Sequence, residues 1–169
     1  MSFKHKFLEF ATIAHNTKAI GYHNGFQTRW NGSPYINHPI AVEKNALKIA
    51  VKYGYVLPWQ LEIVSSVSYT HDVDEDTNIT YEDWENLFLD IRRSGINIDY
   101  NIDFKLIRFA VGALTKRKEN FDLFEYLDGI KRNPYALSVK LADLEHNMSD
   151  LKDKKKLEKY KLIEYYLTH

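Results

Sequence analysis

A histidine and four acidic residues occupy five of the six positions from His71 to Asp76, which read HDVDED. The run follows directly on an apolar segment that is expected to be helical, so its carboxylates lie near the C-terminal end of a helix. Acidic side chains are unfavourable there, because the helix dipole already places negative charge at that end. A divalent cation would offset this charge, and the run therefore predicts a metal site. The alternative is a solvated helix end.

Two distant residues have chemistry that matches this run. Asp143 lies within the apolar stretch LSVKLADL, where a carboxylate is expected to be buried, and hence paired or bound to metal. An ion pair with Lys140 is the alternative for Asp143. His38 precedes Pro39, which suits the first position of a helix, so His38 either caps that helix or supplies an imidazole ligand.

Together these residues would give a mixed set of imidazole and carboxylate ligands: His38, His71, Asp72 and Asp143. The chain contains no cysteine, which excludes thiolate ligands and disulfides. Such a set suits manganese, iron or zinc. Water bound to the ion becomes more acidic and can attack phosphorus. The neighbouring Glu75 and Asp76 are candidates to accept the proton of that water or to orient it.

A polar segment before His38, residues 21–37, is long for a loop, which suggests a function beyond joining two helices. It contains Arg29, whose guanidinium can clamp phosphate through two parallel hydrogen bonds; the alternative is a surface cation. Arg29 lies nine residues before His38, so the loop is expected to hang over the site. Trp30 either anchors the loop on the protein or faces the ligand and stacks on a base.

The elements that must position these residues are all helical. Apolar side chains recur at helical spacing, Pro58 and Pro134 mark helix starts, and Thr80 with Asp83 forms a variant capping box. No convincing alternating strand is present. Helices are predicted over residues 3–20, 39–50, 58–71, 81–93, 102–114, 120–131, 134–144 and 155–167. The chain is therefore predicted to be a single all-α helical bundle over residues 1–169.

Charge and hydropathy exclude several functional classes. The 23 basic residues balance the 23 acidic ones, whereas a general binder of duplex nucleic acid is usually basic. No apolar run approaches the roughly 20 residues that a membrane helix needs. The first ten residues, MSFKHKFLEF, are amphipathic and lack the apolar core of a signal peptide. We therefore expect a cytoplasmic protein that binds neither duplex nucleic acid nor a membrane.

Four motifs carry a resemblance to a known family. They are QTRWNGSPYINHP, then HDVDEDT, then Thr115-Lys116 after an apolar helix, and finally KLADLEHNM. In order and spacing, over roughly residues 10–165, the chain resembles the HD-superfamily hydrolases of the RelA/SpoT type, and specifically the stand-alone small alarmone hydrolases.

The resemblance implies an all-α fold and a manganese-dependent hydrolase that removes the 3′-pyrophosphate from a nucleotide such as ppGpp or ppApp. It implies a metal bound by His38, His71, Asp72 and Asp143, with Glu75 and Asp76 acting on the nucleophilic water. It also implies that Arg29 holds phosphate, while Asn147 and Tyr160 line the nucleoside pocket.

At three positions the chain departs from the family pattern. Trp30 stands where a lysine is frequent, Ser149 where a basic residue is common, and Asp150 where a small residue is usual. All three make the expected pocket less basic.

Two other functions remain open from the sequence. One is an HD nucleotidase acting on ordinary nucleotide phosphates, which would release orthophosphate or triphosphate from the 5′ position. The other is a module that binds a nucleotide without turnover, and the intact metal and water-activating residues argue against it. A synthetase is not expected, because too little chain follows the HD region for a second catalytic domain.

Overall fold

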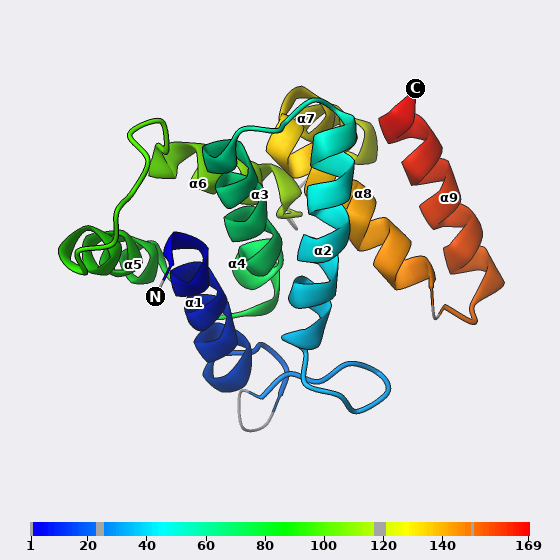
Figure 1. Ribbon diagram of the computed structural model, residues 1–169. Coiled ribbons are helices and arrows are strands. Elements are labelled where there is room, and N and C mark those ends of the chain that lie inside the picture. The colour runs from blue at the N-terminus through cyan, green and yellow to red at the C-terminus, as the bar shows by residue number, and fades with distance from the viewer. Residues whose placement is uncertain (1, 23–25, 117–120, 150) are drawn as a thin grey trace.

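The computed structural model describes residues 2–22, 26–116, 121–149 and 151–169. Within these ranges the protein is helical, and its β pairings are two isolated bridges, Ala19–Thr77 and Thr28–Pro34. The helices, shown in Figure 1, are α1 (Phe3–Thr17), α2 (Asn37–Lys52), α3 (Pro58–Thr70), α4 (Val73–Asp76), α5 (Tyr81–Arg93), α6 (Phe104–Leu114), α7 (Leu123–Arg132), α8 (Pro134–Met148) and α9 (Lys154–Thr168). The prediction of an all-α fold is confirmed.

Helix ends differ from the sequence prediction where a side chain caps the helix. Asp103 accepts a hydrogen bond from the backbone of Lys105, so α6 begins later than residue 102. Asp122 likewise caps α7, and the predicted start of that helix at residue 120 lies outside the described residues. The predicted capping box of Thr80 and Asp83 is present at α5. The short α4, which is absent from the predicted helices, is the main addition.

Helix α3 forms the centre of the bundle. Every residue from Ile63 to Thr70 is buried, although five of the eight are serine, threonine or tyrosine. Three of the hydroxyl groups donate to carbonyl oxygens one turn earlier, as Ser68 does to Val64 at 2.8 Å, so their burial leaves no donor unpaired. His71 therefore stands at the end of a rigid, fully buried helix.

Small side chains bring α2 and α8 close together beside α3. On α2 the buried positions Val42, Ala46 and Ala50 follow one another at intervals of one turn, and α8 presents Ala136 and Ala142. Small residues at a helix interface allow the backbones to approach, and this contact places the N-terminal end of α2 beside the C-terminal half of α8 (Figure 1). His38 and Asp143 occupy those two positions.

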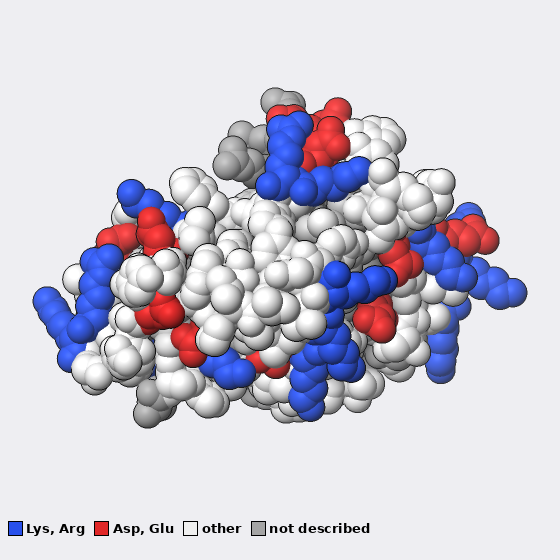
Figure 2. Space-filling view, turned by 45° about the horizontal axis from the view of Figure 1, so that its top comes forward, with Lys and Arg blue, Asp and Glu red and all other residues white. Residues whose placement is uncertain are grey.

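Charged side chains of both signs are scattered over the surface, as Figure 2 shows for one face. Among the described residues, none of the helices combines the length and the apolar character needed to cross a membrane.

Candidate metal and nucleotide site

The metal-ligand candidates come together in the structure. His38 at the start of α2, His71 after α3 and Asp143 in α8 are all buried, and their candidate ligand atoms lie within 4.8 Å of one another. The Nε2 atom of His38 is 3.2 Å from Asp143 Oδ1, and that of His71 is 3.8 Å from the same oxygen. Asp72 completes the group, because its Oδ2 lies 2.9 Å from His71 Nε2 and 3.6 Å from His38 Nε2.

Helix geometry fixes which nitrogen of His71 faces this group. Its Nδ1 lies 2.8 Å from the carbonyl oxygen of Ser68, which can only accept, so Nδ1 carries the hydrogen. In the neutral ring Nε2 then holds a lone pair directed toward the carboxylates. This buried Nε2 makes no well-aligned hydrogen bond among the described residues, although Asp72 Oδ2 lies 2.9 Å away. An orphaned imidazole nitrogen beside two carboxylates is a donor set that fits a divalent transition-metal ion.

Electrostatics favour the ionised forms of both aspartates. Burial alone would raise the pKa of Asp143, but the ammonium of Lys140 and the nearby imidazoles hold it well below its usual range. The pKa of Asp72 is likewise held low, since His71 and His38 outweigh its burial. Burial would lower the pKa of His71, yet the charges of Asp72 and Asp143 raise it to about 10. Without a cation, His71 is therefore protonated, and a bound ion would have to displace that proton.

Both sequence interpretations of Asp143 hold at once. Its Oδ2 accepts from Lys140 Nζ at 2.8 Å, which is the ion pair considered as an alternative to metal binding. Its Oδ1 faces the two histidines and also accepts from Asn147 Nδ2 at 2.5 Å. One carboxylate thus connects the half-buried ammonium of Lys140, the metal-ligand group and a predicted nucleoside-binding residue.

The three acidic residues of α4 point in different directions. Asp74 turns away from the metal-ligand group, accepting from Trp84 Nε1 at 2.7 Å and from Arg108 at 2.8 Å, and it fixes α4 to α5 and α6. Glu75 lies at the rim, 3.0 Å from the Nζ atom of Lys116, which belongs to the Thr115-Lys116 motif. Asp76 is half-buried and accepts from the side chain of Gln27 at 2.9 Å.

These groups line a cavity of about 500 Å³. Three of the predicted substrate-binding residues, Arg29, Asn147 and Tyr160, lie in its wall together with Glu75 and Asp76. Both terminal nitrogens of Arg29 donate to Asn147 Oδ1, at 3.1 and 3.2 Å. Arg29 therefore places this part of the loop at the cavity wall.

Trp30 does not line the large cavity. It lines a smaller adjoining hollow of about 190 Å³, whose wall also includes Arg29, Asn147 and Tyr160. Trp30 as a residue is 67% exposed. Part of the predicted loop, residues 23–25, and the departure at Asp150 lie outside the described residues.

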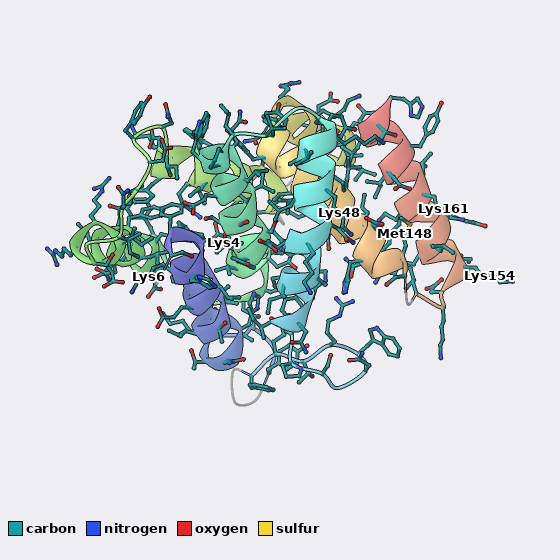
Figure 3. The ribbon with its side chains drawn as sticks, in the orientation of Figure 1. Lys4, Lys6, Lys48, Met148, Lys154 and Lys161 are labelled. Carbon is teal, nitrogen blue, oxygen red and sulfur yellow. The ribbon has the colours of Figure 1, made fainter. Side chains whose placement is uncertain are left out.

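Basic residues that the sequence reasoning missed come from α9. Lys156 and Lys159 line the large cavity with Tyr160, and the Nζ atom of Lys156 lies 5.6 Å from the Tyr160 ring centre. Lys154 and Lys161 project from the same helix away from the bundle (Figure 3). Lysines of the run KDKKKLEKYK therefore add positive charge to the cavity, and the expectation from Trp30, Ser149 and Asp150 stays a prediction.

Three further residues around the site were not singled out from the sequence. Tyr35 donates from its hydroxyl to Asp72 Oδ2, Gln27 contacts Asp76, and His146 lies with its Nδ1 2.8 Å from Nδ1 of His38. All three belong to the motifs QTRWNGSPYINHP and KLADLEHNM. Their presence in these motifs was the only sequence evidence that they belong to the site, and it did not indicate what each one does.

Comparisons with known proteins agree with this arrangement, although no protein-family profile matches the chain. The bifunctional (p)ppGpp synthase/hydrolase SpoT of Escherichia coli K12 is 31% identical over 129 residues, which are 76% of this chain and 16% of SpoT. A probable GTP pyrophosphokinase of Mycobacterium leprae is 30% identical over 75% of this chain and 14% of its own length. The chain thus spans about a sixth of these curated relatives.

A solved structure shares the fold. It is described as a metazoan ortholog of SpoT that hydrolyses ppGpp, and it aligns with a TM-score of 0.60 and 21% identity over 99% of this chain and 84% of its own. The sequence similarity, the helical fold and the His/Asp group agree: the chain is similar to the RelA/SpoT-type proteins of the HD superfamily.

Proposed function

We propose that the protein hydrolyses the 3′-pyrophosphate group of an alarmone nucleotide, (p)ppGpp or (p)ppApp, in the cytoplasm. The observation that carries this proposal is the buried His/Asp group, which opens into a cavity whose wall carries five basic side chains: Arg29, Lys116, Lys140, Lys156 and Lys159. The names of the relatives support it, since they include guanosine-3′,5′-bis(diphosphate) 3′-pyrophosphohydrolases.

The metal would be held by Nε2 of His38 and His71 and by the carboxylates of Asp72 and Asp143, and manganese is the ion we propose. When bound, the ion supplies a Lewis acid and lowers the pKa of a coordinated water. Tyr35 supports Asp72 through a hydrogen bond, and His146 supports His38.

Two carboxylates would handle the attacking water. Asp76 is suited to accept its proton, because burial and the charge of Asp72 raise the pKa of Asp76 in spite of the hydrogen bond from Gln27. Glu75 is tied to Lys116 at the rim, where the pair can orient the water or the leaving pyrophosphate. The water oxygen bonds to the phosphorus attached at the ribose 3′ oxygen. The P–O3′ bond breaks, pyrophosphate departs, and the ribose oxygen takes up a proton.

The rest of the cavity would hold the nucleotide. Arg29, Lys156 and Lys159 can neutralise its phosphates, and Tyr160 offers an aromatic face for the nucleoside. Trp30, in the adjoining hollow, can stack on a base in a way that tolerates either guanine or adenine.

A turnover screen tests the proposal. The protein with Mn²⁺ is incubated with ppGpp, pppGpp, ppApp and the common nucleoside triphosphates, with the Asp143→Ala variant as the metal-site control. Pyrophosphate released from an alarmone is the expected result. Orthophosphate or triphosphate released from ordinary nucleotides would replace the proposal with a nucleotidase, and tight binding with no product would indicate a binding module.

A further inference from the structure

A buried chain of hydrogen bonds leads from α1 to the acidic turn. His15, near the end of α1, is fully buried, and its Nδ1 lies 2.6 Å from the side-chain oxygen Oε1 of Gln27. The amide nitrogen of Gln27 in turn donates to Asp76 Oδ2 at 2.9 Å. Gln27 is itself only 6% exposed, so these contacts are made away from bulk water.

The direction of each hydrogen bond in this chain is determined. Oε1 of Gln27 can only accept, so Nδ1 of His15 must carry a hydrogen. Burial lowers the pKa of His15, although the hydrogen bond with Gln27 opposes this, so the ring is neutral with its hydrogen on Nδ1. The Gln27 amide cannot flip without placing its NH₂ group against the N–H of His15 and its oxygen against Asp76. His15 therefore fixes the orientation of the Gln27 amide, so that its NH₂ group faces Asp76.

The backbone holds both ends of the chain in place. The amide N–H of Gln27 donates to the carbonyl of His15 at 2.8 Å, and the amide N–H of Ile20 donates to the carbonyl of Asp76 at 2.9 Å. The loop after α1 is thus attached to the helix before it and to the end of α4. Such double attachment limits the positions that the Asp76 carboxylate can take.

We propose that Gln27 and His15 are positioning residues that aim the carboxylate of Asp76 at the attacking water. This inference rests on the proposed function. Gln27 holds Oδ2, which leaves Oδ1 as the oxygen that meets the water in the cavity. The ring of Tyr35 packs against that of His15, with 4.6 Å between the ring centres. The hydroxyl of Tyr35 donates a hydrogen bond to Asp72, so His15 also helps to position Asp72.

Three substitutions separate positioning from packing. Gln27→Met keeps the length of the side chain but removes the donor. His15→Phe keeps a ring against Tyr35 but removes the donor to Gln27, whereas His15→Asn loses the ring and keeps an N–H group near the place of Nδ1. Gln60→Met is the matched control. It removes a side-chain amide that caps the N-terminal end of α3, the end opposite His71.

Steady-state kinetics, metal titration and thermal unfolding are measured for each variant. Loss of a residue that holds a site residue through a hydrogen bond typically lowers activity by about 10- to 100-fold. We expect kcat to fall by this factor in Gln27→Met, with KM and metal affinity nearly unchanged. His15→Phe should lose kcat although it unfolds near the wild-type temperature. His15→Asn should retain more kcat although it unfolds earlier. Gln60→Met should lower stability alone.

Coupling to Asp76 decides whether Gln27 acts through it. In an Asp76→Asn background, Gln27→Met should cause little further loss of kcat, because the group it positions no longer accepts a proton. Independent losses that multiply would overturn the inference.

A crystal structure of Gln27→Met gives a readout that does not need turnover. We expect the Asp76 carboxylate to rotate away from its present direction, and an unmoved carboxylate would overturn the inference. If the wild-type protein turns over no alarmone, the proposed function fails, and this structure still decides whether Gln27 positions Asp76.

Discussion

Nδ1 of His38 lies 2.8 Å from Nδ1 of His146, and this contact joins the first turn of α2 to the last turn of α8. Two facing nitrogens can form a hydrogen bond only if one carries a hydrogen and the other does not. A neutral His38 that offers Nε2 to a metal must carry its hydrogen on Nδ1. His146 is then the acceptor, and it fixes the tautomer of His38.

Removing this acceptor should weaken metal binding. We expect His146→Leu to lower manganese affinity by about 10- to 100-fold, as is typical when the outer partner of a metal-bound histidine is lost. His146→Asn, whose side-chain oxygen can accept near the same place, should recover most of the affinity. Isothermal titration of the metal-free protein measures both. Equal affinities in the wild type and the leucine variant would show that the contact is incidental.

Asp143→Ala should abolish metal binding and also destabilise the fold. The second effect arises because Lys140 would be left buried without its carboxylate partner, and breaking a buried pair costs about 3–5 kcal/mol. The double variant Asp143→Ala/Lys140→Met should regain much of the stability but none of the metal. Denaturant unfolding in a chelator and elemental analysis check the two parts, and full manganese occupancy in Asp143→Ala would contradict the ligand assignment.

Glu75→Gln and Asp76→Asn should both keep the metal and lose turnover. General-base catalysis typically contributes about 10²–10⁴-fold, and we expect the larger loss at Asp76, whose pKa burial raises. Glu75 is paired with Lys116, so part of its effect should reappear in Lys116→Met. Single-turnover rates at saturating metal measure each loss. A variant that works within a few-fold of wild type excludes its carboxylate as the base.

Trp30→Lys tests base stacking. Trp30 is 67% exposed, so the substitution should leave the unfolding temperature nearly unchanged. A lysine adds a point charge and removes the aromatic face, so the KM should depend more steeply on salt and the ratio of activity on ppGpp and ppApp should change. Kinetics across a salt series supply both quantities. An unchanged base ratio with a lower unfolding temperature would make Trp30 structural.

His15 should make the protein sensitive to acid. Burial lowers the pKa of His15 below its usual 6.5, so the unfolded chain binds a proton there more readily than the folded protein does. Stability is therefore intact above this value and is lost as the pH falls below it. From about pH 7.5 to about pH 5.5, the wild type should lose more unfolding free energy than His15→Phe, both in chelator. Parallel pH profiles would contradict the buried neutral state.

The sequence was most informative where residue type alone restricts the chemistry. An aspartate within LSVKLADL, and a histidine followed by four acids at the end of a buried helix, have few stable environments, so the metal-ligand candidates could be named. The directions of Asp74, Glu75 and Asp76 could not be predicted. In a helical turn successive residues point roughly 100° apart, and the formation of α4 itself was not foreseen.

Contacts between distant elements were also beyond the sequence. Gln27 lies in a polar loop, where an amide is ordinarily exposed, and its burial depends on how the loop packs on α1. Lys156 and Lys159 reach the cavity only because α9 folds back beside α8. The sequence pattern predicts that these lysines lie on a helix. Which of them face the cavity and which face water depends on how α9 packs against α8.

The placement of Asp143 on α8, opposite His38 on α2, ties the site to the order in which the chain folds. His38, His71 and Asp72 belong to the first half of the sequence, while Asp143 arrives only when α8 packs against α2. Closing so long a loop is entropically costly and is expected late in folding. An intermediate without α8 would present an incomplete ligand set and hold an ion weakly. Tight binding of the ion would therefore require the complete bundle. Its binding free energy would stabilise the packing of the two halves of the chain against each other.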